Sequence, residues 1–162
     1  MNEYLTEQLV KRRQTAVTTM KKAGLIAVTV LSAFLALFHP LLIWVTVILA
    51  VVDSFLFKRM NIEFEYVYFN GDLDIDKIMN MQSRKRVFSS NIKEVDVIAR
   101  SASVELQPYQ RYKVLDYSTQ NSDDKVYEMV TKFKGEPVRV LFNPNEKMLD
   151  DMKNMAPRKV FI

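Results

Sequence analysis

The chain has 162 residues, no cysteine, one histidine and a formal net charge of +4. Without cysteine it has no disulfide bond, thiol nucleophile or thiolate metal site. Its length leaves room for one membrane segment and one small domain, and excludes a second enzyme-sized domain.

The basic excess lies in the first third of the chain. Residues 1–60 hold seven Lys and Arg against three carboxylates, whereas residues 61–162 hold 16 of each sign and are neutral overall. Nucleic-acid binding requires a basic surface, so we do not expect a nucleic-acid partner for the polar remainder of the chain.

Residues 1–22 are predicted to form a basic amphipathic helix. Within it, residues 2–14 carry apolar side chains at roughly helical spacing with charges among them, and this pattern ends in Lys11-Arg12-Arg13. These apolar residues are Tyr4, Leu5, Leu9 and Val10. Such a helix would lie on an anionic inner leaflet. A frayed polar tail is the alternative.

Residues 23–59 are predicted to form a transmembrane helical hairpin with its turn at His39-Pro40. A continuous helix over the 34 residues from Gly24 to Phe57 would be about 51 Å long, and the hydrocarbon core needs about 30 Å. Proline lacks a donor and disfavours helix at the residue before it, so two helices, Gly24 to Phe38 and Leu41 to Phe57, fit better.

Basic residues flank the apolar segment on both sides. They are Lys11, Arg12, Arg13, Lys21, Lys22, Lys58 and Arg59. A hairpin puts all of them on one side of the bilayer, and basic flanks mark the cytoplasmic side. We therefore predict a multi-pass protein of the cell membrane with cytoplasmic termini. One tilted helix, kinked at Pro40 and followed by an extracytoplasmic domain, is the alternative.

Two polar residues interrupt the apolar segment. Asp53 is close to Lys58, so we expect it to be solvated or paired near the membrane surface; an intramembrane functional carboxylate is the alternative. His39 is expected to be a polar residue of the turn.

Residues 60–162 are predicted to form a cytoplasmic β domain. Residues 62–69 are rich in aromatic and β-branched side chains, residues 72–76 alternate strictly, and Asn70-Gly71 between them is a hairpin signal. Further strands are expected at 84–89, 94–99, 112–119, 125–133 and 138–142.

A C-terminal helix is predicted at about 144–155. Asn143 would cap it, Pro144 would occupy its first turn, and an apolar stripe containing Met148 and Met152 would face the core. The predicted fold class is α+β: a transmembrane hairpin, then a small antiparallel β-barrel or sheet capped by a helix, the element order of a pleckstrin-homology-like (PH-like) domain.

The run from Asn61 to Ile78, followed by Ser83-Arg84-Lys85-Arg86, resembles a family of small membrane proteins from clostridia and related Firmicutes. That family, a domain of unknown function, has two N-terminal transmembrane helices and a bacterial PH-like C-terminal domain. The likeness covers nearly the whole chain. It implies the architecture, and it implies no activity or catalytic residue.

We do not expect an enzyme. The one histidine lies in the membrane segment, and Gly24, Gly71 and Gly135 are too far apart for a phosphate-binding loop. No catalytic residue, metal ligand or cofactor is predicted. Asp72, Asp74 and Asp76 are expected to form a solvated strand face, with weak divalent-cation binding as the alternative.

Arg84-Lys85-Arg86 is the candidate binding site. Strand alternation puts Arg84 and Arg86 on one face, which a hairpin topology would hold near the anionic leaflet. Pairing of both arginines with the Asp72, Asp74 or Asp76 carboxylates is the alternative. Two functions remain open: a non-catalytic scaffold that binds an unidentified protein partner, and a module that senses anionic lipid.

Overall fold

The computed structural model describes residues 5–79 and 83–162, except for the side chain of Arg59. The chain forms two compact units. The helical unit comprises Gln14–Ile62, and the β unit comprises the N-terminal strand with Glu63–Ile78 and Ser83–Ile162.

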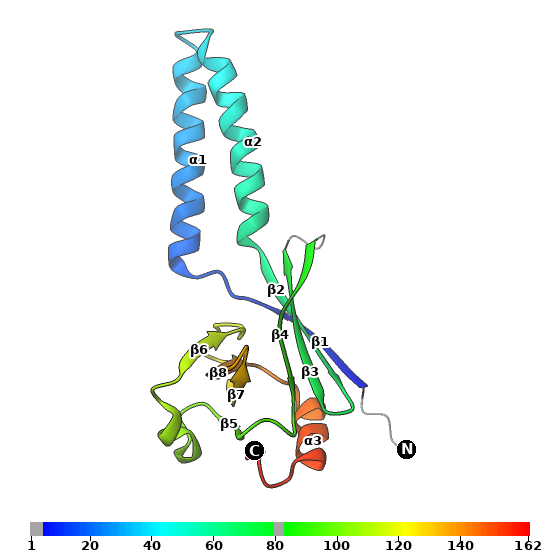
Figure 1. Cartoon of the computed structure of the whole chain (residues 1–162). Helices are drawn as coiled ribbons and strands as arrows, with labels where there is room; N and C mark the ends of the chain where they lie inside the picture. The colour runs from blue at the N-terminus through cyan, green and yellow to red at the C-terminus, as the bar shows by residue number, and fades with distance from the viewer. Residues whose placement is uncertain (1–4, 80–82) are drawn as a thin grey trace. The chain divides into compact units, whose positions relative to one another are not determined.

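The helical unit is an antiparallel pair, α1 (Ala16–Ala36) and α2 (Leu42–Met60), which lie side by side (Figure 1). His39 and Pro40 lie in the connection between the helices. None of the residues of α1, all of which the structure describes, is buried. By length and composition, α1 is the one helix among the described residues that is able to cross a membrane.

A polar seam runs between these apolar helices. Thr29 Oγ1 donates a hydrogen bond of 2.6 Å to Asp53 Oδ2, and the Ser32 and Thr46 hydroxyls are 3.0 Å apart. Asp53 is only 7% exposed. Of the two predicted states of Asp53, solvated or paired, the structure shows the paired one: the partner helix covers its carboxylate and supplies a donor.

The first sheet of the β unit has the strand order β1-β2-β3-β4. Its strands are β1 (Leu5–Lys11), β2 (Ile62–Phe69), β3 (Asp72–Met79) and β4 (Ser83–Asn91). Asn70 and Gly71 have φ of 46° and 100°. Positive φ at both positions is what a two-residue hairpin turn requires, so the predicted β2–β3 turn is confirmed.

The predicted N-terminal amphipathic helix is wrong for residues 5–11. They form β1, which pairs antiparallel with β2 from Leu5 opposite Phe69 to Lys11 opposite Glu63. Leu5 and Leu9, four residues apart, share a face in a strand as they do in a helix, so their spacing does not separate the two. Pairing with β2 decided the outcome. Tyr4, which the helix prediction also used, lies outside the described residues.

The second sheet has the order β5-β7-β8-β6. Its strands are β5 (Val97–Arg100), β6 (Lys113–Asp116), β7 (Tyr127–Phe133) and β8 (Glu136–Phe142). The β6–β8 pair is parallel, so the all-antiparallel prediction is wrong there. Between β5 and β6, at opposite edges of this sheet, the chain crosses over through a 3-10 helix, η1 (Val104–Tyr109). After this crossover β6 runs in the same direction as β8. The described strands form two separate sheets and not one closed barrel.

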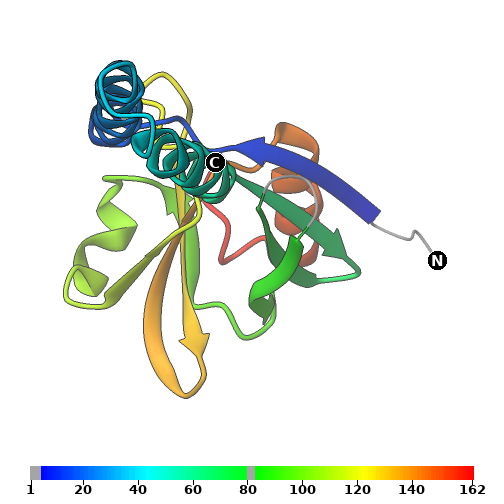
Figure 2. The ribbon, with the colours of Figure 1, turned by 90° about the horizontal axis from the view of Figure 1, so that it is seen from above.

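The C-terminal helix is confirmed as α3 (Glu146–Met155), which lies beside β1 (Figures 1 and 2). Met148 and Met152 are fully buried. Asn145, and not Asn143, caps α3 by accepting a 2.8 Å hydrogen bond from Met148 N. Thr6 Oγ1 on β1 donates a buried 2.8 Å hydrogen bond to Asp151 Oδ2 on α3.

The second sheet also contains a buried ion pair. Arg139 donates to Glu128 Oε2 from Nε at 2.8 Å and from Nη2 at 2.6 Å. Arg139 Nη1 reaches Gln110 after η1, and Ser101 Oγ donates 2.7 Å to Glu128 Oε1. The pair therefore ties β7 and β8 to the η1 crossover.

Replacing Arg139 by Met is expected to destabilise the fold by about 3 to 5 kcal/mol, because it leaves the Glu128 carboxylate buried without its partner. Thermal unfolding of the full chain in detergent, followed by circular dichroism, measures the effect. Lys132→Met, at an exposed position of β7, is the matched control. Equal melting temperatures for the two variants would contradict the assignment.

Candidate functional site

The predicted site residues Arg84, Lys85 and Arg86 lie on β4, and the two arginines pair with acidic side chains. Arg84 Nε is 2.8 Å from Asp76 Oδ2, and Arg84 also pairs with Glu65. Arg86 reaches Asp74 at 2.7 Å and Asp76 Oδ1 at 3.1 Å.

The structure therefore shows the alternative in which both arginines pair with strand carboxylates, and these carboxylates belong to Asp74 and Asp76. Asp72 instead accepts a 2.6 Å hydrogen bond from Asn91 Nδ2.

Asp76 is the centre of this cluster. It is 5% exposed, so the expectation of a fully solvated acidic face is wrong at this position. Burial opposes its ionisation, but hydrogen bonds from Arg86 and Arg84 outweigh burial and lower the pKa of Asp76. Two arginines against three carboxylates leave the cluster with no positive excess. Its arginines, although about half exposed, are not free cations.

A basic pocket adjoins the cluster, with a volume of about 390 Å³. Its charged lining is Arg12, Lys77, Lys85, Arg86, Lys134 and Asp116, and its other residues are Phe64, Val87 and Tyr117. Five cations thus surround one carboxylate. Within the described part of the chain, Lys77, Lys85 and Lys134 form no salt bridge.

Different elements of the β unit supply the pocket residues. Arg12 directly follows β1, and its guanidinium lies 5.8 Å from the Phe64 ring centroid. Lys77 comes from β3 and Lys85 from β4. Lys134 precedes Gly135 in the β7–β8 turn, where both residues have positive φ, 53° and 85°. The pocket therefore depends on the assembled sheets and not on one local motif.

Asp116 is a fixed anion in this pocket. It accepts hydrogen bonds from Ser118 N at 2.9 Å, Ser118 Oγ at 2.6 Å and Gln120 Nε2 at 2.8 Å. Burial opposes its ionisation, but the hydrogen bonds from Gln120 and Ser118 outweigh burial and lower the pKa of Asp116. Its Oδ2 lies 3.4 Å from Arg12 Nη2, so Asp116 orients Arg12 and offsets one of the five positive charges.

The arrangement suits an anionic ligand with several oxygens. Lysine ammonium groups bind phosphate as point charges with three donors each. Phe64 and Tyr117 add apolar surface beside these charges. Among the described residues no group of three His, Cys, Asp or Glu side chains could hold a metal ion.

Sequence reasoning found only part of this pocket. The sequence predicts Lys85 and Arg86 as site residues and Arg12 as a membrane-flanking residue, and it predicts no site role for Lys77 or Lys134. The strict alternation of β3 was a usable signal, because it puts Lys77 on the face of Leu73 and Ile75, opposite the aspartates. Lys134 carried no such signal, since its place depends on the packing of the two sheets.

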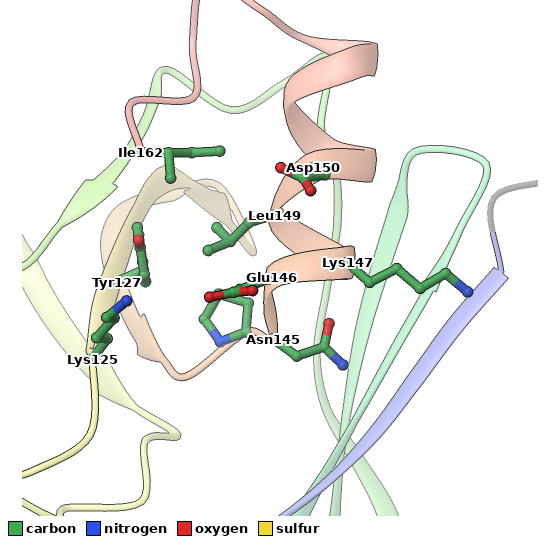
Figure 3. Close-up of a pocket in the computed structure, with 9 residues that line it drawn as sticks. Lys125, Tyr127, Asn145, Glu146, Lys147, Leu149, Asp150 and Ile162 are labelled. Carbon is green, nitrogen blue, oxygen red and sulfur yellow. The ribbon is translucent and has the colours of Figure 1, made fainter.

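A second hollow of about 780 Å³ lies beside the N-terminus of α3 (Figure 3). Its charged residues are Lys125, Glu146, Lys147 and Asp150. Two cations and two anions give it no preference for a ligand of either sign. The basic pocket is therefore the candidate site.

Comparison with known proteins gives one result. A family model described as "Bacterial PH-like domain (DUF6106)" matches residues 2–162. No curated protein and no solved structure matches the chain.

The Asp76 cluster predicts an acid-dependent loss of stability. Because the folded-state pKa of Asp76 is lowered, its stabilisation is present above the unfolded-state value of about 3.9 and is lost as the pH falls through the lower folded value. We expect Asp76→Asn to lower the melting temperature at pH 7. Its melting temperature should then fall less than that of the wild type when the pH is reduced below about 4.

Asp150→Asn, at an exposed position of α3, is the control. The pKa of Asp116 is lowered as well. The measured quantity is therefore the difference between each variant and the wild type over pH 3 to 7, a range set by the usual carboxyl pKa of about 4. Parallel curves for Asp76→Asn and the wild type would show that the Asp76 pairs do not stabilise the fold.

Proposed function

The chain belongs to the family of bacterial PH-like domains (DUF6106), and from this premise we propose that it is a non-catalytic module on the cytoplasmic face of the membrane. In this proposal α1 and α2 cross the bilayer, and the basic pocket holds the phosphate of an anionic lipid head group. The observation that carries the lipid proposal is the convergence in one pocket of Lys77, Lys85 and Lys134, which form no salt bridge with any described residue.

The pairing of β1 with β2 supports two crossings. Lys11 lies opposite Glu63, and the helices lie between these residues in the sequence. Two strands paired in one sheet lie on the same side of a membrane. A chain that left through α1 must therefore return before Glu63, and α2 provides the return.

The polar seam supports the same arrangement for α2. A carboxylate near the middle of a spanning helix costs about 2.5 to 3.5 kcal/mol. Such residues face partner helices in membrane proteins and pair there. Asp53 is buried against α1 and accepts a hydrogen bond from Thr29, so α1 provides the environment that α2 needs.

Chain length keeps the pocket close to the lipid. Arg12 lines the pocket and precedes the first residue of α1, Ala16, by four positions. Four residues span about 14 Å when fully extended. If α1 enters the bilayer, Arg12 must lie within that distance of the helix start, where each basic residue gains about 1 kcal/mol from an anionic surface.

Binding of a protein partner is a second candidate function. The observation that favours it is a set of large apolar side chains exposed on the first sheet: Leu5, Leu9 and Phe69 are 50%, 60% and 45% exposed. Leu5 and Phe69 are directly opposite each other. A protein partner could cover this surface without using the pocket.

The two-crossing proposal predicts that both termini are cytoplasmic and that His39 is outside. Because the chain has no cysteine, His39→Cys and Lys153→Cys each carry one thiol for a membrane-impermeant maleimide. We expect labelling of His39→Cys on intact cells, and labelling of Lys153→Cys only after permeabilisation. Labelling of Lys153→Cys on intact cells would overturn the topology.

The lipid proposal predicts that the purified full chain in detergent binds short-chain phosphatidic acid or phosphatidylglycerol. Replacing Lys77, Lys85 and Lys134 together by Gln should weaken binding about a hundredfold, since each lysine contributes about 1 kcal/mol. Isothermal titration calorimetry measures the change. The matched control replaces three exposed lysines outside the pocket, Lys113, Lys132 and Lys153.

Two comparison ligands complete the experiment. Phosphatidylcholine tests the need for net negative charge, and inorganic phosphate tests whether the lipid is needed at all. Equal loss of affinity in the pocket and control variants would reject the pocket as the site and leave the protein-partner function.

A further inference from the structure

Among the described strands, none pairs with the outer edge of β1, so this edge of the first sheet is open. β1 is the terminal strand in the order β1-β2-β3-β4, with β2 on its inner side. Thr6 and Val10 face the core, whereas Leu5, Glu7, Leu9 and Lys11 are exposed. An edge strand presents backbone donors and acceptors to another strand, and exposed apolar side chains favour such pairing.

The charge pattern of β1 is complementary to itself. In an antiparallel pair of two β1 strands centred on Leu9, each Leu9 faces the other, and each Glu7 faces Lys11 of the second copy. Centring on Glu7 would oppose two carboxylates, and centring on residue 8 would oppose each leucine with a charge. Neither Glu7 nor Lys11 forms a salt bridge within the described part of the chain.

We propose that β1 of one copy pairs antiparallel with β1 of a second copy, with Leu9 at the two-fold centre and Glu7–Lys11 ion pairs on either side. The contact is isologous, so it closes with two copies. Cross-strand opposite-charge pairs and apolar pairs both stabilise an antiparallel contact. A seven-residue strand buries less than the roughly 1,200 Å² of a stable interface, so the contact is reversible.

This inference does not depend on the basic pocket or on lipid binding. Of the charged side chains in the contact, Lys11 also lies opposite Glu63 across the β1–β2 pair. Lys11 therefore stands between the carboxylate of its own sheet and that of the second copy. Glu7 lies opposite an uncharged residue, Val67. Its charge acts on Arg84 of the same sheet, although these two described side chains form no salt bridge, and its ion-pair partner in the contact comes from the second copy.

Cysteine cross-linking tests the register directly, because the chain has no cysteine of its own. Leu9→Cys, in the full chain reconstituted in phosphatidylcholine nanodiscs that hold two copies, should form a disulfide dimer on mild oxidation. Leu5→Cys is the matched control: it replaces the same residue type on the same face of β1. In the proposed register the two thiols of the Leu5→Cys pair are eight positions apart, about 27 Å. We expect Leu9→Cys to cross-link about tenfold faster than Leu5→Cys. This ratio corresponds to a difference of about 1.4 kcal/mol in the free energy of bringing the two thiols together.

An experiment with a mixture of two variants tests the Glu7–Lys11 pairs. Chains with Glu7→Cys and chains with Lys11→Cys, carrying tags of different size, should cross-link with each other in preference to themselves. In an otherwise native Leu9→Cys chain, Glu7→Lys should slow cross-linking several-fold, because it places like charges opposite each other. Glu136→Lys, an exposed carboxylate on β8, is the control for the change in net charge.

The outcomes separate the possible occupants of the edge. Equal cross-linking at Leu5 and Leu9, or preferred self-linking at Glu7, would overturn the pairing. Lys153→Cys, at an exposed position of α3, gives the background rate of cross-linking. If no β1 variant cross-links faster than this background, the pairing is also overturned, and a different protein becomes the candidate partner of the edge. Thermal unfolding of each variant shows whether a loss of cross-linking reflects a loss of fold.

Discussion

The pairing of β1 with β2 is the constraint on which the rest of the structure depends. These strands are separated by about 50 residues in the sequence, yet Lys11 and Glu63 face each other. The helical segment is thus an insertion between two neighbouring strands of one sheet. The β unit is not contiguous in the chain, and it cannot be separated from the helices by cutting after α2 without losing β1. The same pairing ties the residues before α1 and the residues after α2 to one sheet. A chain that leads away from this sheet along α1 must therefore lead back to it along α2.

The two units use buried polar groups in different ways. In the β unit, Glu128 and Arg139 satisfy each other and hold the η1 crossover, and Thr6 joins β1 to Asp151 of α3. In the helical unit, Asp53 and Thr29 form a polar contact between two largely apolar helices, next to the Ser32–Thr46 contact. Each of these groups would be costly if left unpaired, so each specifies one arrangement of the elements around it.

In the basic pocket, strand pairing decides which of the basic side chains are neutralised by carboxylates and which are not. The β4 sequence Arg84-Lys85-Arg86 is basic, but Asp74 and Asp76 on β3 and Glu65 on β2 neutralise the two arginines. The cations outside these pairs come from Lys77, Lys85 and Lys134, which lie on different elements. The proposed head-group site and the proposed β1 contact use different residues of the β unit.

The sequence by itself determined the elements whose signals are local. The two apolar helices with the His39-Pro40 connection, the Asn70-Gly71 turn and the methionine stripe of α3 all follow from composition, spacing or turn chemistry, and the family match agrees with the PH-like element order. Tertiary structure decided what those signals leave open. Leu5 and Leu9 suit a strand as well as a helix, so only a distant partner, β2, made residues 5–11 a strand. The parallel β6–β8 pair and the pocket that joins Arg12 to Lys134 likewise arise from contacts between residues far apart in the chain, and spacing along a sequence carries no record of such contacts.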